Sequence, residues 1–254
     1  TTVFPILHEN GIPGCFFPSA KAIRKHEVSN VNKIHFMLAL TSNIHDLCLE
    51  VNECLDKYRS EYSLESNDYY YLKLTQTNRL KTAFPQQKEI VFIKRLLQTE
   101  LYEKLRNLIT DELFCKYVTN DEELFSKELY MSIDQLKCMA RNGMYIGSHG
   151  YDHEWLDTMT IDKQKQEIDL SLEFINEVGS STENWIMCYP YGAYNNSLLN
   201  LLTDRGCLLG LTTEVRFADL KKDNPLTLPR IDTNDLTQNL NVSPKEWKMK
   251  GLSR

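Results

Sequence analysis

The sequence predicts an α/β fold with parallel strands, interrupted by a helical segment. The first observation is a repeated unit near both ends of the chain, in which an apolar helical stripe stops at a glycine and a short apolar run follows. Helices that alternate with short buried runs are typical of a parallel sheet or barrel. The second observation is that residues 30–131 lose this rhythm and show charged sequence with helical periodicity.

The repeated unit occurs four times. A glycine just past each helix is well suited to the left-handed conformation that ends helices. The stripes lie within residues 3–7, 133–139, 168–175 and 198–202, and the strands expected after them lie at residues 14–17, 144–147, 185–188 and 207–211. Leu226–Leu228 is a further candidate strand.

The middle of the chain is expected to be helical. Leu47, Val51, Cys54 and Leu55 share one helix face, and a longer stripe follows at Ile90, Ile93, Leu97, Leu101, Leu105 and Leu108. We therefore assign residues 1–29 and 132–254 to an α/β domain and residues 30–131 to a helical insertion subdomain. The polar stretch from about Thr233 is expected to be a surface tail.

Composition excludes several classes of protein. The 254 residues carry 29 Lys and Arg against 35 Asp and Glu, a net charge of −6, which argues against a basic, nucleic-acid-coating protein. No run approaches the roughly 20 apolar residues of a membrane span. The seven cysteines have neither redox-motif nor zinc-knuckle spacing, which favours reduced core thiols in a cytoplasmic protein.

Polar residues follow several expected strands, at the ends where parallel α/β folds carry their chemistry. They are residues 148–153 (SHGYDH), 189–192 (YPYG), 212–214 (TTE) and 229–232 (PRID). His149 and His153 are separated by three residues on one loop, and neutral imidazoles at this spacing are able to share a metal ion. The alternative is two polar loop residues that bind nothing.

Together these segments resemble the NodB-like polysaccharide deacetylases. The His149–His153 loop with Leu156 is similar to the family's metal motif, and residues 189–195 to its Pro-Tyr loop. The paired Thr212-Thr213 and the run Leu228–Ile231 also occur in the family's order. The resemblance covers residues 1–24 and about 132–232, and it implies a distorted (β/α) barrel of the polysaccharide deacetylase type.

The chain also departs from that family. The family's Asp-Asp motif, which supplies a general base and a third metal ligand, is expected upstream of Thr1 and is absent from this sequence. Cys188 stands where an Arg normally holds the base, and no His follows His153 to act as general acid. We expect Arg230 to take over the orienting task, because a guanidinium holds a carboxylate through two hydrogen bonds.

The resemblance implies metal-assisted removal of an N-acetyl group from an amino sugar, in surface polysaccharide biosynthesis or modification. His149 and His153 would hold a divalent metal, and the resemblance implies zinc. Tyr191 and Arg230 are the expected catalytic residues, and Tyr151, Pro190 and Tyr191 the expected substrate contacts. The sugar's carrier (polymer, lipid or nucleotide) and homo-oligomerisation stay open. The alternative is a catalytically inactive carbohydrate-binding relative, which the missing Asp pair and Cys188 favour if the chain is complete.

Overall fold

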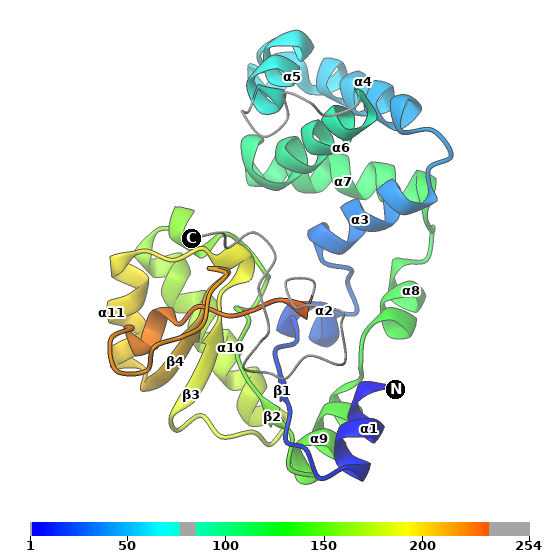
Figure 1. Cartoon of the computed structure of the whole chain (residues 1–254). Helices are drawn as coiled ribbons and strands as arrows, with labels where there is room; N and C mark the ends of the chain where they lie inside the picture. Colours follow the sequence, from blue (N-terminus) through cyan, green and yellow to red (C-terminus); the bar gives the residue numbers. More distant parts are fainter. Residues whose placement is uncertain (1, 77–84, 234–254) are drawn as a thin grey trace, which may run out of the picture. The chain divides into compact units, whose positions relative to one another are not determined.

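The protein divides into two compact units, which we describe separately (Figure 1). The computed structural model describes residues 2–76 and 85–233. The first unit comprises residues 1–25 and 131–254, and the second comprises residues 26–130 between them in sequence. The expected surface tail falls almost wholly on residues 234–254, which lie outside the described residues.

Short parallel strands in the first unit position its loops. β1 (Cys15–Phe16) pairs with β2 (Tyr145–Ile146), and β3 (Trp185–Cys188) pairs with β4 (Cys207–Leu211), both in parallel. Single parallel bridges extend the pairing from Ser148 to Met187 and from Leu211 to Leu228. Neighbouring segments therefore follow one another in sequence order, and their carboxyl ends face the same way.

The helices between these strands begin at side-chain caps and end at glycines. Ser132 forms a capping box with Gln135, while Thr160 and Asn195 cap the next two helices. The glycines after the three helices have positive φ, as the sequence predicts. The α-helices of this unit are α1 (Val3–Glu9), α2 (Ala20–Lys25), α9 (Ile133–Arg141), α10 (Ile161–Glu177) and α11 (Asn196–Asp204).

A buried cluster joins β3 to the helices that cover it. Trp185 and Met187 of β3 are fully buried and pack with Ile168 of α10 and Leu198 of α11. The indole Nε1 of Trp185 donates a hydrogen bond to the carbonyl of Arg205 at 2.8 Å, so this large side chain leaves no buried donor unpaired. The cluster fixes the strand that leads directly into the Pro-Tyr loop.

The strand expected at Leu226–Leu228 is wrong in its extent. Pro225–Thr227 forms a short 3₁₀ turn, η5, and only Leu228 makes a β-bridge. Asn224 Oδ1 accepts the backbone N–H of Leu226 at 2.9 Å, and Pro225 has no N–H to give to a ladder. The turn chemistry therefore overrides the apolar pattern until Leu228 reaches β4.

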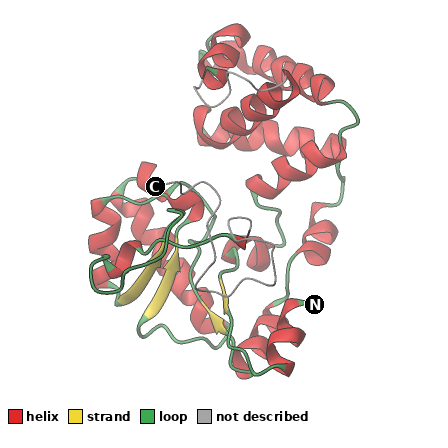
Figure 2. Ribbon diagram, viewed as in Figure 1, coloured by secondary structure: helices red, strands yellow, loops and turns green. Residues whose placement is uncertain are grey.

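The second unit is a helical cluster with its own core (Figure 2). Leu47, Val51, Cys54 and Leu55 lie on the buried face of α4, as their spacing predicts. The α-helices are α3 (Asn30–Leu40), α4 (Ile44–Tyr62), α5 (Asn67–Thr75), α6 (Pro85–Arg95), α7 (Glu103–Tyr117) and α8 (Glu122–Leu129).

The long stripe at residues 90–108 does not form one continuous helix. It is interrupted by a wider, π-helical turn, η2 (Leu96–Glu100), where the N–H of Leu101 bonds to the carbonyl of Leu96 at 3.3 Å. Arg106 donates to the carbonyl of Gln98 at 2.7 Å, which satisfies a group left over by the break. Leu101 is buried, whereas Leu108 is exposed.

Two expectations from composition concern the described residues. Within the described ranges, no helix combines the length and the apolar character that crossing a bilayer requires. All seven cysteines are free thiols, and five are buried or half-buried. Cys15 and Cys115 are exposed, so the prediction of core thiols is wrong for these two.

Candidate active site

The first candidate metal ligand, His149, lies just beyond β2 and is oriented by β3. Ser148 extends the parallel pairing, because its N–H donates to the carbonyl of Ile186 at 3.0 Å and its own carbonyl accepts from Cys188 at 2.9 Å. His149 Nδ1 lies 2.6 Å from the carbonyl oxygen of Cys188. A carbonyl only accepts, so Nδ1 carries the proton and Nε2 keeps a lone pair. That is the arrangement of an imidazole prepared to bind a metal.

The charge state of His149 supports the same role. Burial lowers the pKa of His149, and the positive charge of Arg230 lowers it further, against the hydrogen bond to Cys188. The neutral ring is therefore favoured at neutral pH, and only a neutral imidazole has a lone pair for a metal.

His153 lies beside His149 at the other end of the loop. Their ring centroids are 4.7 Å apart and the ring planes meet at 70°. His153 has a left-handed backbone, with φ of 58°, so the chain turns sharply between the two histidines. The structure thus brings together the two residues that the sequence singled out as ligands.

The Pro-Tyr loop lies directly against His153. Pro190–Gly192 forms a 3₁₀ turn, η4, after β3, and the ring of Tyr191 meets the edge of His153 with centroids 4.9 Å apart. Tyr191 has φ of 57°, a conformation that is rare for a residue with a side chain. The expected catalytic and substrate-contact residues Pro190 and Tyr191 are therefore adjacent to the histidine pair.

Gly192 allows this loop to approach the end of β4. It has φ of 73°, and a Cβ atom there would lie 2.2 Å from Oγ1 of Thr213. A larger residue would therefore clash as well as strain the backbone. The paired threonines and the Pro-Tyr loop are packed at one rim because this position has no side chain.

Arg230 is exposed, and it hydrogen-bonds to backbone carbonyls just after β4. Its Nε donates to the carbonyl of Thr212 at 2.7 Å, and its N–H donates to the carbonyl of Glu214 at 3.0 Å. Cys188 is buried, which raises the pKa of its thiol, although the charge of Arg230 opposes that rise. The positive charge of Arg230 therefore acts on both Cys188 and His149.

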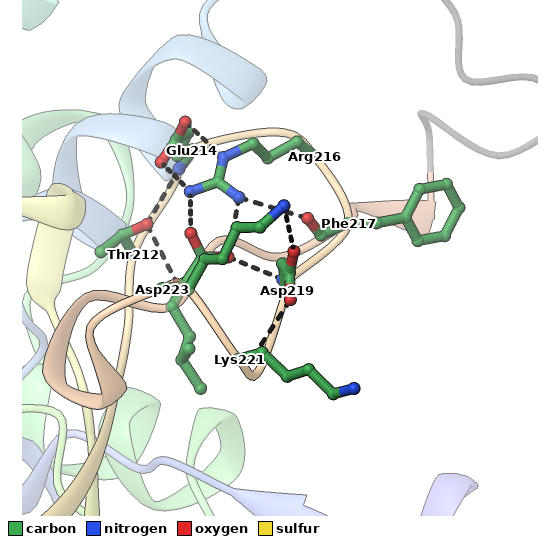
Figure 3. Close-up of polar contacts among 9 residues, drawn as sticks. Thr212, Glu214, Arg216, Phe217, Asp219, Lys221 and Asp223 are labelled. Carbon is green, nitrogen blue, oxygen red and sulfur yellow. Dashed lines mark hydrogen bonds and ion pairs between the residues drawn. The ribbon is translucent and has the colours of Figure 1, made fainter.

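The loop that follows β4 is braced by a second arginine (Figure 3). Arg216 lies between two carboxylates, at 2.7 Å from Glu214 and 2.8 Å from Asp223. Asp223 also accepts the N–H of Asp219 at 2.7 Å, which closes the loop on itself. Figure 3 shows the exposed ring of Phe217 pointing away from this network.

Sequence reasoning missed two residues that shape the site. Trp155 stacks on Tyr191, with centroids 4.3 Å apart and planes 3° from parallel. Glu167 of α10 is 8% exposed, and its Oε2 accepts the N–H groups of Tyr151 and Asp152 at 2.9 and 3.0 Å. The sequence did offer one signal for Glu167, which is an acidic residue beside Ile168 at the start of an apolar helical stripe. A buried carboxylate needs hydrogen-bond partners, so such a residue is a candidate for a structural contact.

A divalent metal fits these residues as a partial ligand set. The two imidazoles lie side by side, and the carbonyl of Cys188 fixes the tautomer of His149 that leaves Nε2 as donor. Within the parts of the chain that the structure describes, no group of three or more His, Cys, Asp and Glu side chains is placed to hold a metal. A complete site therefore needs a third ligand beyond this pair.

Comparison with known proteins finds similarity to polysaccharide deacetylases over part of the chain. Residues 117–209 match the model of the polysaccharide deacetylase family, which agrees with the resemblance noted for the NodB-like motifs. The protein named "Putative polysaccharide deacetylase YxkH" from Bacillus subtilis (strain 168) is 32% identical over 85 residues. That match covers 34% of this chain and 30% of the relative, so less than a third of the relative's length is matched.

Solved structures of similar proteins include three from bacteria. Streptococcus pyogenes deacetylase PplD in complex with acetate is 23% identical with a TM-score of 0.39, covering 49% of this chain and 57% of that one. The BpsB deacetylase domain from Bordetella bronchiseptica is 17% identical with a TM-score of 0.35, covering 41% and 49%. A family 4 carbohydrate esterase from Streptomyces lividans in complex with acetate is 22% identical with a TM-score of 0.28, covering 34% and 41%. The similarity to polysaccharide deacetylases is therefore taken from the sequence matches and not from these structures.

Proposed function

We propose that this chain is part of a metal-dependent carbohydrate N-deacetylase, which hydrolyses the N-acetyl group of an amino sugar during surface polysaccharide biosynthesis or modification. The observation that carries the proposal is the pairing of His149 with His153, 4.7 Å apart, directly beside the Pro190–Gly192 turn. The match of residues 117–209 to the polysaccharide deacetylase family supports the reaction class.

We further propose that the first unit is a distorted (β/α) barrel and that residues 30–131 are a helical insertion. Support comes from the parallel pairing of β1, β2, β3, β4 and Leu228 in sequence order, without the reversal of order that defines a doubly wound sheet. In such a barrel the loops after successive strands share one rim. That rim would carry His149, Tyr191, Thr213 and Arg230.

Within this proposal each residue has a stated role. Zinc, the proposed metal, when held by His149 and His153, supplies Lewis-acid polarisation of the amide carbonyl and a lowered pKa for water. By family resemblance, the backbone N–H of Tyr191 faces the developing oxyanion, and Tyr151 and Pro190 contact the sugar. Arg230 orients the general base. An Asp-Asp motif upstream of Thr1 would supply that base and the third ligand.

The experiment measures acetate release from N-acetylglucosamine oligomers with zinc added and with a chelator added. We expect release that depends on zinc and is lost in His149→Ala and His153→Ala. His45→Ala is the matched control, because that ring is exposed in the helical unit and bonds to Glu89 at 2.7 Å. Lipid-linked and nucleotide-linked N-acetyl sugars, tested in parallel, identify the carrier. Equal release in all variants would contradict the proposal.

An inactive carbohydrate-binding relative is the second candidate. The specific observations that favour it are Cys188 at the position of the usual arginine and a described ligand set of two histidines. It predicts binding of N-acetylated oligomers without acetate release. The first candidate predicts turnover on the same oligomers, so one experiment separates them.

A further inference from the structure

The loop between the two candidate ligands is hydrogen-bonded to helix α10. Glu167 lies on the buried face of α10, and one of its oxygens, Oε2, accepts the N–H groups of two consecutive residues, Tyr151 and Asp152. The distances are 2.9 and 3.0 Å, and the side chain is 8% exposed. Two adjacent N–H groups aimed at one oxygen form a small anion-binding concavity, which this chain fills with its own carboxylate.

Lys21 also contacts this loop, through its backbone and its side chain. The N–H of Lys21 donates to the carbonyl of Tyr151 at 2.9 Å, and Lys21 Nζ lies 2.7 Å from Asp152 Oδ2. The side chains of Lys21 and Asp152 are each about one-third exposed, at 32% and 34%. Water competes with such a pair, whereas a buried carboxylate keeps its bonds at nearly full strength. Glu167 is thus the buried support of this loop.

We propose that Glu167 is a positioning residue of the candidate metal site: by holding the backbone of Tyr151 and Asp152, it keeps His149 and His153 at the spacing that lets them share one metal ion. This inference rests on the proposed function, since it concerns the same histidine pair. Glu167 acts through the loop backbone and need not touch the metal. The proposal thus adds to the candidate site a residue that lies outside the ligand motif.

The size of the expected effect follows from the place of Glu167 behind the ligands. Groups that orient metal ligands typically contribute about 10–100-fold to metal affinity. Glu167→Ala removes the acceptor of both N–H groups and should weaken zinc binding by that factor. Glu167→Gln keeps a carbonyl oxygen where Oε2 lies and loses only the charge, so it should stay within about threefold of the wild type.

Gln164 offers a matched control on the same helix. It is fully buried, and its Nε2 donates to the carbonyl of Leu156 at 2.8 Å and to Asn195 Oδ1 at 3.2 Å. Gln164→Ala therefore removes a buried polar group of similar size without freeing the backbone between the histidines. It should lower the melting temperature of the metal-free protein and leave zinc affinity within about threefold of the wild type.

The test is isothermal titration of zinc chloride into each folded protein with the proposed upstream Asp-Asp segment present, and with the metal-free melting temperature measured beside it. Weak binding by Glu167→Ala together with near-normal binding by Glu167→Gln and Gln164→Ala is the expected result. Should Glu167→Ala not fold, Glu167→Asp replaces it, because a side chain shorter by one methylene cannot reach both N–H groups and should also bind zinc weakly.

The experiment distinguishes failure of the Glu167 inference from failure of the proposed function. If the wild type binds zinc and Glu167→Ala binds it equally well, the inference is overturned and the proposed function stands. Equal weakening in Glu167→Gln and Glu167→Ala would also overturn it, because charge and not the two hydrogen bonds would then be responsible. If the wild type itself binds no zinc at His149 and His153, the proposed function fails, and the inference fails with it.

Discussion

The indole ring of Trp155 lies flat against the phenol ring of Tyr191, with centroids 4.3 Å apart and planes only 3° from parallel. Tyr191 also contacts the ring of His153, and the two ring planes meet at 75°. The ring of His153 in turn contacts that of His149. Tyr191, which has a left-handed backbone, thus lies between two rings of the segment that carries the histidine pair, Trp155 and His153. The loop that carries His149 and His153 therefore contacts the Pro-Tyr loop through these rings.

The stack should be measurable as a coupling energy. In a double-mutant cycle, Trp155→Ala and Tyr191→Ala should show about 0.5–1.5 kcal/mol of interaction free energy beyond the sum of the single effects. Urea unfolding of the wild type, both single variants and the double variant gives this value. Trp155→Phe keeps a ring and should retain part of it. A coupling near zero would show that the two rings do not support one another.

Arg230 should matter for turnover more than for stability. Its Nε bonds to the carbonyl of Thr212, and a lysine has no nitrogen at that position and no planar fork. We expect Arg230→Lys to reduce acetate release at least about tenfold, roughly 1.4 kcal/mol in the transition state, with the melting temperature nearly unchanged. Arg216→Lys is the control, since that arginine braces the neighbouring loop. Unchanged turnover in Arg230→Lys would remove it from the mechanism.

Gly210 of β4 has no space for a side chain. A Cβ atom there would lie 2.1 Å from the carbonyl oxygen of Leu226 and 2.6 Å from the hydroxyl of Tyr189. Gly210→Ala should therefore lower the free energy of unfolding by about 3 kcal/mol, through displacement of backbone. Gly179→Ala, which has φ of 80° and no atom within 4 Å of its Cβ, should cost only about 1 kcal/mol. Chemical denaturation compares the two, and equal losses would contradict the packing.

The ion pair of Asp169 with Arg205 should give a pH-dependent contribution to stability. Two bonds of 2.7 and 3.0 Å join the side chains, and the hydrogen bond from Arg205 holds the pKa of Asp169 below its ordinary value of 3.8. Because the folded pKa is the lower one, the contribution is present above pH 3.8 and is lost as pH falls through the folded value. Both side chains are more than one-third exposed, so about 0.5–1 kcal/mol is expected.

Thermal unfolding of Asp169→Asn at several pH values checks this contribution. The variant should be less stable than the wild type at pH 7 by about 0.5–1 kcal/mol, and the difference should shrink toward zero as the pH falls through the lowered pKa of Asp169. Asp162→Asn is the control, because Asp162 is 90% exposed and lies 3.7 Å from Lys165. A difference between wild type and Asp169→Asn that stays constant with pH would contradict the assignment.

The parts of the fold that follow from local sequence were predictable. The runs at residues 185–188 and 207–211 form β3 and β4 with those bounds, since a glycine stop and a short apolar run specify a buried strand. The expected strand at Leu226 failed because Pro225 and Asn224 impose a turn. The stripe at residues 90–108 is divided between α6 and α7, because the π-helical turn at Leu96–Glu100 interrupts the regular α-helical hydrogen bonding.

The candidate site was predictable only where its motif is local. His149 and His153 share one loop, so their spacing was informative, and Tyr191 was found through the neighbouring motif. Glu167 and Trp155 were missed because their roles depend on tertiary contacts: one carboxylate reaches back 15 and 16 residues to the loop, and one ring crosses to another loop. Neither relationship has a fixed spacing that sequence periodicity reveals.

The central claim, that His149 and His153 share one metal ion, is tested most directly by anomalous diffraction at the zinc edge from crystals of the protein grown with zinc. We expect a single strong peak between the two imidazoles, about 2.0–2.1 Å from a ring nitrogen of each. The nitrogen on His149 should be Nε2, because Nδ1 is bonded to the carbonyl of Cys188. Well-ordered rings with no peak between them, or a zinc ion bound elsewhere in the chain and absent from this pair, would contradict it.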